Sequence, residues 1–313
     1  MYCGLQSPNI TGRDMRVQHL NCGSMREIEP HDGPDSQLKP ARAVCHCLLI
    51  ETDTDGLVLI ETGLGLADVQ RPSDSLSEEF LGRAQPVLDP EETAVRHVAR
   101  LGYAPADVRH IVLTHLDVDH AGGLPDFPHA KVHVHEAEHQ AAMAAPGHHP
   151  EDRVRYRPAQ WAHHPHWVTY ASHQGDPWFG FDAVRPLDGM PPEILLIPLA
   201  GHTRGHTAVA VQVTDRAGPA PRWLLHCGDA YYYHGEIDPT NPRPHPGMDT
   251  LQNIAEVDRP LRLGNAARLR ELVRSHGDDV EAFSAHDPWE LQRYRQPTPA
   301  NAAPRPGRID ETR

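Results

Sequence analysis

Short apolar, β-branched runs alternate with helical patterns through both halves of this chain. The strand-like runs lie at residues 17–20, 43–52, 57–62, 109–114, 131–134, 194–199, 208–213, 223–227 and 279–285. Helices are expected between them, at residues 91–102, 136–145 and 266–276. This alternation predicts a mixed α/β fold in which helices cover the outer faces of paired sheets.

Four of the predicted strands end in histidine or aspartate. The patterns are HLDVDH (115–120), GHTRGHT (201–207), HCGDA (226–230) and SAHD (284–287). Side chains that bind ligands gather at the carboxyl ends of strands in α/β sheets, where loops present them to one point. A surface turn rich in Asp and His accounts for one such pattern, whereas one shared metal centre accounts for all four together.

A second pattern of metal-ligand type, HEAEH (135–139), lies just after the first. A zincin site needs both histidines inside a long helix, one turn apart on the same face. Here His135 directly follows a predicted strand, and Pro146 ends the helix soon afterwards. We therefore expect HEAEH to hold no metal, with Glu136 and Glu138 favoured by the positive end of the helix.

Composition limits the partners of the chain. With 313 residues and 39% hydrophobic content, the chain can bury a full core as one large domain or two small ones. The formal net charge of −14 argues against nucleic-acid and anionic-membrane partners, so a small-molecule substrate is expected. The five cysteines include no CxxC pair, which favours a reducing, cytoplasmic setting. The sequence leaves the oligomeric state open.

Residues 14–295 are expected to form the folded domain, with a ragged N-terminus at 1–13 and a disordered, Pro-rich tail at 296–313. Within the domain, residues 148–181 form a long irregular segment of the kind found in lids and insertions. Its arginines are candidates for meeting a substrate carboxylate: Arg153, Arg155 and Arg157. Its tryptophans either enclose a substrate or pin the segment to the core: Trp161, Trp167 and Trp178.

The ordered set of strand-end motifs resembles the metallo-β-lactamase superfamily, whose signature is HxHxDH, GHTxGH, a GD step and a late histidine. The resemblance runs from Val17 to Asp287 and includes LVLIETGLG, in which Glu61 stands in place of the family's Asp. It implies an αββα sandwich, with two mixed sheets packed face to face and helices on both outer faces. It also implies two divalent metal ions at one edge between the sheets.

The same resemblance implies the ligands. One ion would take His115, Asp117 and His202, and the other would take Asp119, His120 and His286. Asp229 would bridge the two ions. The second histidine of GHTRGHT, His206, would support the site rather than bind metal.

Within the superfamily, the chain looks most like N-acyl-homoserine lactonases. These carry HxHxDHAGG, GHTPGH and a D-A-x-Y step, and Tyr232 matches their tyrosine that contacts the substrate carbonyl. The implied activity is hydrolysis of a lactone, ester or thioester by a metal-bridging hydroxide, with Asp119 orienting it and Tyr232 stabilising the oxyanion. A glyoxalase II-like thioesterase is the alternative. Cys227 is expected to be a small buried residue and not a nucleophile.

Asp117 departs from the superfamily signature, which has histidine at this position. Zinc is the ion that the family implies, but a harder, anionic ligand shifts preference towards iron or manganese. Flavodiiron proteins carry a glutamate here, so a di-iron redox domain is a hypothesis of another class. Those proteins work beside a flavin partner, and no flavodoxin-like region remains in this chain.

Overall fold

The computed structural model describes residues 15–33, 36–52, 55–144, 151–171, 175–214 and 221–295. The predicted ragged N-terminus at 1–13 and the predicted tail at 296–313 lie outside these residues. None of the described helices is both long and apolar enough to cross a membrane.

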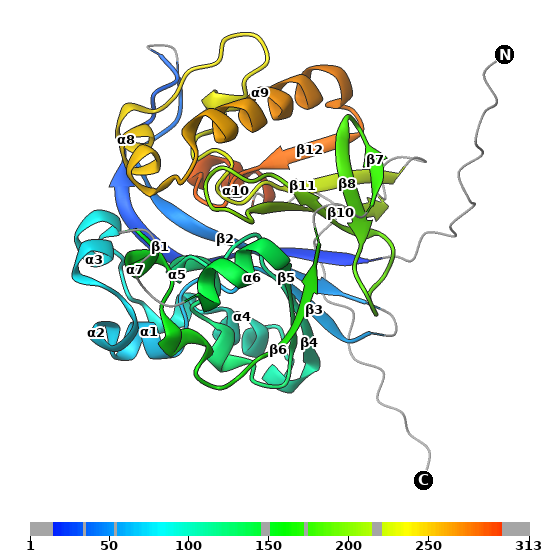
Figure 1. The fold of residues 1–313 in the computed structure, drawn as a ribbon. Helices are drawn as coiled ribbons and strands as arrows, with labels where there is room; N and C mark the ends of the chain where they lie inside the picture. The colour runs from blue at the N-terminus through cyan, green and yellow to red at the C-terminus, as the bar shows by residue number, and fades with distance from the viewer. Residues whose placement is uncertain are drawn as a thin grey trace, which may run out of the picture.

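The described strands form two six-stranded mixed sheets (Figure 1). The first sheet has the order β1 (Arg16–Ile28), β2 (Ala41–Glu51), β3 (Leu57–Ile60), β4 (Val108–Val112), β5 (Lys131–His135) and β6 (His166–Tyr170). The second has the order β12 (Val280–Phe283), β11 (Pro221–His226), β10 (Thr207–Thr214), β9 (Ile194–Pro198), β8 (Phe181–Pro186) and β7 (Asp176–Trp178). Strands β3 to β6 run parallel, as do β11 and β12, and the other neighbours are antiparallel.

The interior between the sheets follows from the alternation of side chains along each strand. Leu48 and Ile50 of β2 point into a cluster that also contains Val209 and Val211 of β10. Leu49, between them, points the other way and packs under the helices of the first sheet. Strand β2 therefore has apolar side chains on both of its faces. This is expected for a strand in a sheet that is buried between a second sheet and a layer of helices.

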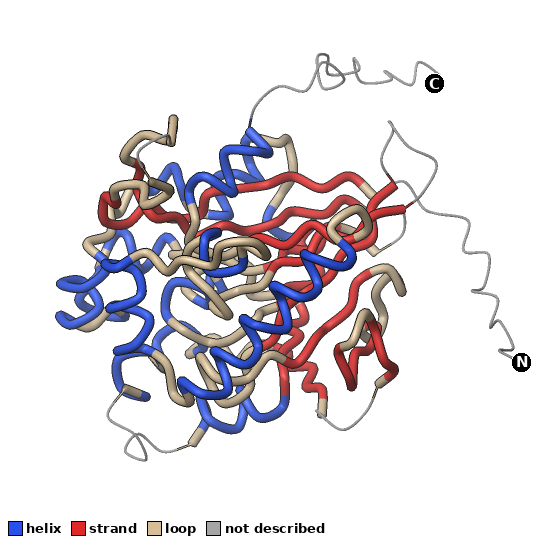
Figure 2. Tube along the Cα trace, turned by 90° about the horizontal axis from the view of Figure 1, so that it is seen from above, coloured by secondary structure: helices blue, strands red, loops and turns tan. Residues whose placement is uncertain are grey.

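Helices cover both outer faces (Figure 1). Beside the first sheet lie α1 (Leu66–Gln70), α2 (Pro72–Ser75), α3 (Glu78–Ala84), α4 (Ala94–Arg100), α5 (Val118–Ala121), α6 (Glu136–Met143) and α7 (Asp152–Arg155). Beside the second lie α8 (Pro246–Ala255) and α9 (Arg259–His276), and α10 (Pro288–Arg295) packs against β1 and β2. Figure 2 shows the long helix α9 running across the strands of the second sheet. The predicted sandwich, with two mixed sheets and helices on both outer faces, is confirmed.

The segment 148–181 contributes to both sheets. Its described residues form α7, a 3-10 turn η4 (Pro158–Trp161), the edge strand β6 and strand β7. Trp161 and Trp167 pack against the core under the first sheet, and Trp178 packs against the core under the second. Residues 148–150 and 172–174 of this segment lie outside the described residues.

Candidate metal centre

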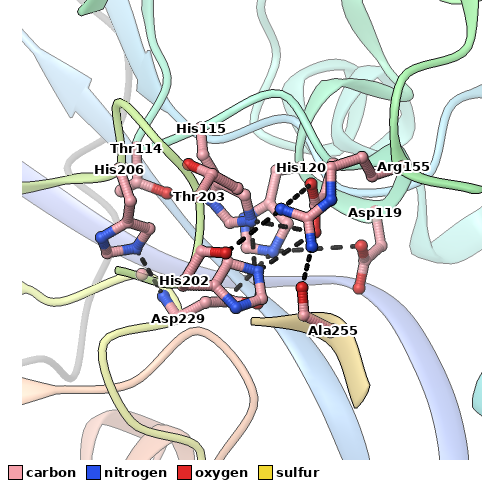
Figure 3. Close-up of polar contacts among 12 residues, drawn as sticks. Thr114, His115, Asp119, His120, Arg155, His202, Thr203, His206, Asp229 and Ala255 are labelled. Atoms are coloured by element: carbon pink, nitrogen blue, oxygen red, sulfur yellow. Dashed lines mark hydrogen bonds and ion pairs between the residues drawn. The ribbon is translucent and has the colours of Figure 1, made fainter. Parts of the chain in front are cut away.

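The loops that follow β4, β9, β11 and β12 meet at one edge of the sandwich (Figure 3). They bring together all seven residues predicted as metal ligands. One group consists of His115, Asp117, His202 and Asp229, and a second consists of Asp119, His120 and His286. Within each group, one potential ligand atom of every residue lies within 4.8 Å of the others.

Asp229 lies between the two groups and faces both. Its Oδ1 is 3.2 Å from His120 Nε2 and 3.1 Å from His286 Nε2. Its Oδ2 is 3.7 Å from His115 Nε2, 3.3 Å from His202 Nε2 and also 3.2 Å from His286 Nε2. The carboxylate thus contacts imidazole nitrogens of both groups, as a bridging ligand would.

Several atoms that point into this centre have no hydrogen-bond partner among the described residues. They include Nε2 of His115, Nε2 of His120 and Oδ1 of Asp229, all of which are buried. Leaving a buried polar atom unpaired costs about 1–3 kcal/mol, so atoms that converge on one point without partners indicate a missing ligand. A nitrogen and carboxylate donor set of this kind fits divalent transition metals.

Three of the histidines are oriented through their second ring nitrogen. Nδ1 of His115 contacts Thr114 Oγ1 at 2.9 Å, and Nδ1 of His120 contacts Glu61 Oε2 at 3.0 Å. Nδ1 of His286 contacts the Val44 carbonyl oxygen at 2.9 Å. Such contacts fix the tautomer and aim the other nitrogen at the metal position. Glu61 has a left-handed φ of 64° and also accepts a bond from the Thr114 N–H at 2.6 Å. Glu61 therefore braces His120 and the strand end at Thr114 from the position at which the family has an aspartate.

His206 lies behind the centre and outside both ligand groups. Its Nε2 accepts a hydrogen bond from the Asp229 N–H at 2.9 Å, and its Nδ1 donates to the Leu199 carbonyl at 3.0 Å. This ring holds the loop that carries Asp229, in line with the supporting role expected for it. Cys227 is fully buried, and burial raises the pKa of its thiol well above the ordinary value, so it is not a ready nucleophile.

The HEAEH segment spans the start of α6, and neither of its histidines belongs to a candidate metal cluster among the described residues. His135 caps the helix, with Nδ1 accepting the Ala137 N–H at 3.3 Å, and the His139 ring packs against Trp167 at 5.1 Å. Glu138, however, is fully buried and points towards the centre. Sequence reasoning missed this, because a glutamate in the first turn of a helix is ordinarily explained by the helix dipole.

The Glu138 carboxylate ties together the loops that carry the ligands. It accepts four bonds, from Leu116 N at 3.0 Å, Gly205 N at 3.1 Å, Thr203 Oγ1 at 2.6 Å and the Tyr156 hydroxyl at 3.0 Å. Leu116 lies in the loop that carries His115 and Asp117. Thr203 and Gly205 lie in the loop between His202 and His206. A single buried side chain thus fixes two ligand loops to each other.

Arg155 was expected to meet a carboxylate of the substrate, yet it meets a carboxylate of the protein. Its Nη1 lies 3.5 Å from Asp117 Oδ1, and the side chain is only 4% exposed (Figure 3). Burial opposes the ionisation of Asp117, but Arg155 and then His115 outweigh it and hold the pKa of Asp117 well below its usual range.

A pocket opens onto the centre. Asp119, Asp229, Tyr232 and His286 line its floor, and Asp117 lies beside them. Its walls are mainly apolar and include Met25, Ile28, Phe80, Ala84, Val118, Val154, Met248 and Leu251. The Tyr232 ring lies 5.0 Å from the His286 ring. Burial, followed by the charge of Asp229, raises the pKa of Tyr232, so its hydroxyl stays protonated and can donate a hydrogen bond.

The loop that carries His286 is held by a partly buried charge cluster. His234 Nδ1 donates to Asp287 Oδ2 at 2.7 Å, and its Nε2 donates to Asp32 Oδ1 at 2.8 Å. Arg243 also donates to Asp32, at 3.0 Å. Burial lowers the pKa of His234, but Asp287 and then Asp32 outweigh it and raise the pKa from 6.5 to about 9. The protonated imidazole is therefore the form that the folded protein favours.

We expect the His234 cluster to make stability depend on pH. Because the pKa is raised on folding, the stabilisation is complete below pH 6.5 and is lost as the pH rises through about 9. Its size is at most about 3 kcal/mol for this shift. Urea denaturation of metal-free protein between pH 6 and 10 measures it. His234→Gln should be less stable at pH 6 and should lack the loss in this window; an unchanged pH profile would contradict the assignment.

Comparison with known proteins agrees with this geometry. A family model described as the metallo-beta-lactamase superfamily matches residues 41–275. A probable metallo-hydrolase of Mycobacterium tuberculosis is 41% identical over 293 residues, which cover 92% of this chain and 86% of that protein. An N-acyl homoserine lactonase of Bacillus thuringiensis is 26% identical over 267 residues, with 82% and 88% of the two chains covered.

Solved structures share the fold. A structure of an N-acyl homoserine lactone hydrolase, with the product N-hexanoyl-L-homoserine at its catalytic metal centre, has a TM-score of 0.63 at 21% identity and covers 90% of this chain and 96% of its own. The dizinc quorum-quenching lactonase AidC has a TM-score of 0.53 at 18% identity, with 90% of each chain covered.

Proposed function

Because this chain belongs to the metallo-beta-lactamase superfamily, we propose that it is a dinuclear-metal-dependent hydrolase of an ester-like bond in a small molecule. The observation that carries the proposal is Asp229, whose two oxygens face two groups of ligand-type side chains on the floor of a pocket. A site for one ion would need only one of these groups.

In this proposal His115, Asp117 and His202 would hold one ion, and Asp119, His120 and His286 would hold the other. Asp229 would contribute its carboxylate to both. Zinc is the ion that the family implies, whereas the carboxylate of Asp117 favours iron or manganese. When bound, a pair of divalent ions supplies an activated water and polarises the carbonyl that is attacked.

The side chains around the pocket perform the remaining steps. Asp119 lines the pocket, so its carboxylate can accept a hydrogen bond from the attacking water, orient it and pass on its proton. Tyr232 donates its hydroxyl proton in a hydrogen bond to the carbonyl oxygen as that oxygen becomes negative. No serine or cysteine nucleophile is required.

The substrate is proposed to be a lactone with an apolar substituent. The apolar walls of the pocket would remove such a substituent from water, and the presence of Tyr232 matches the lactonase pattern. Lactonases are also among the proteins that this chain resembles. A glyoxalase II-like thioesterase is the alternative, since the same centre can attack a thioester carbonyl.

Metal analysis followed by a substrate panel tests the proposal. Protein reconstituted separately with Zn²⁺, Mn²⁺ and Fe²⁺ should bind two ions per chain, and it should hydrolyse an N-acyl homoserine lactone faster than a matched ester or thioester. Faster thioester cleavage would favour the alternative. Binding of at most one ion, or absence of hydrolysis with every metal and substrate, would contradict the proposal. Oxygen reduction by the Fe²⁺ form without hydrolysis would favour a redox domain instead.

A further inference from the structure

We propose that Arg155 is a positioning residue of the metal centre, which pairs with Asp117 so that the two charges together replace one neutral imidazole. The inference rests on the proposed function, because it assigns Asp117 as a metal ligand. It explains how a carboxylate can occupy a position where the superfamily signature has histidine. A carboxylate alone would add one negative charge to a buried site, and the guanidinium cancels that charge.

The guanidinium of Arg155 is held from several sides. Nη1 donates to the His202 carbonyl at 3.3 Å, and Nη2 donates to the Ala255 carbonyl at the end of α8. Nη1 also lies 3.5 Å from Asp117 Oδ1. Arginine stays charged in proteins, so this buried cation needs a fixed negative partner. Among the described residues, Asp117 is the carboxylate that forms an ion pair with Arg155.

The two oxygens of Asp117 have separate partners. Oδ2 lies 3.1 Å from His202 Nε2 and 3.5 Å from His115 Nε2, at the position where the metal ligands converge. Oδ1 is turned to Arg155. The arginine therefore attracts Oδ1 as an ion pair without a hydrogen bond, and this orients the carboxylate so that Oδ2 stays turned toward the other candidate ligands.

The segment that carries Arg155 is also held by contacts independent of the metal centre. Glu151 pairs with Arg83 at 3.1 Å, and Asp152 pairs with Arg204 at 3.0 Å. Arg157 donates from Nε to the Ser75 carbonyl at 2.9 Å. Removing the Arg155 charge should therefore leave α7 in place, and a change in metal binding then reports on Asp117 rather than on loss of the segment.

A double-mutant cycle tests the pair. The variants are Arg155→Met, Asp117→His and the double substitution, and the readout is Zn²⁺ and Mn²⁺ affinity measured by competition with a chromogenic chelator. Asp117→His should weaken binding by about 10- to 100-fold, because it leaves the Arg155 cation facing the ions. Arg155→Met should weaken binding by a similar factor, because Asp117 loses the group that sets its orientation. The double variant should recover Zn²⁺ affinity to within about threefold of wild type, since it restores an imidazole without a facing cation.

Two further variants separate charge from packing. Arg155→Lys keeps the charge and should retain most of the affinity, whereas Arg153→Met removes an exposed arginine of the same segment and should leave metal affinity unchanged. The inference would be overturned if the fold losses of metal affinity in the two single variants multiply in the double variant. It would also be overturned if Arg155→Met binds metal with wild-type affinity. Both outcomes would leave the proposed function intact. Wild-type protein that binds neither metal would overturn both.

Discussion

Asp229→Asn is expected to abolish hydrolysis, because the substitution removes a charge that faces both ligand groups while keeping the shape of the side chain. The loss in kcat/KM should exceed about 1,000-fold, which corresponds to more than about 4 kcal/mol of transition-state stabilisation. Metal content should fall at the same time. Steady-state kinetics on the substrate found in the panel, together with elemental analysis of the same preparation, measures both effects.

The HEAEH histidines supply the matched control for this experiment. His135→Ala and His139→Ala remove imidazoles outside both ligand groups, so they should retain two ions and nearly normal activity. Asp229→Asn with full metal content would show that the carboxylate is not a bridge. Loss of metal from the HEAEH variants, with metal retained in Asp229→Asn, would move the metal site to the other motif.

Glu138→Ala should lower the free energy of unfolding by about 3–5 kcal/mol, because four donors in the protein interior lose their acceptor. The effect should be visible in metal-free protein, since these bonds connect loops and do not involve an ion. Metal affinity should fall as well, because the loops before Asp117 and around His202 are no longer fixed to each other. Urea denaturation gives the stability, and chelator competition gives the affinity.

Glu136→Ala is the control for Glu138→Ala. Both residues lie in the first turn of α6, near the positive end of the helix dipole, but only Glu138 is fully buried among donors. The control should therefore change stability by less than about 0.5 kcal/mol. Equal losses in the two variants would mean that the helix dipole, and not the loop contacts, explains the role of Glu138.

The position of the centre was predictable because its signals are local. Residues His115 to His120 directly follow an apolar run that forms a buried strand. Each of the other loops that carry candidate ligands also directly follows an apolar run. The carboxyl end of a strand fixes where the next few residues lie, so the motif and the strand together place the side chains. The identity of the ions and the substrate depends on contacts beyond these motifs and stays a prediction.

Glu138 and Arg155 show what local patterns do not contain. Glu138 takes partners 22 and 67 residues away in the sequence, and Arg155 donates to a carbonyl 100 residues away. The residues next to Glu138 and Arg155 in the sequence form no motif that would indicate these roles. The edge strand β6 was missed for a related reason: HWVTY is mostly half-exposed and lacks the apolar run that marks the buried strands. These features follow from the assembled fold.

The strand order described above also bears on how the protein assembles. Strands β1 to β6 build one sheet and β7 to β12 build the other, so each sheet comes from one continuous half of the chain. The first half contributes His115, Asp117, Asp119 and His120, whereas the second contributes His202, Asp229 and His286. Neither half alone contains a complete ligand group. If the proposed ions bind, their high-affinity uptake has to follow the docking of the two halves, and each bound ion would slow the separation of the halves.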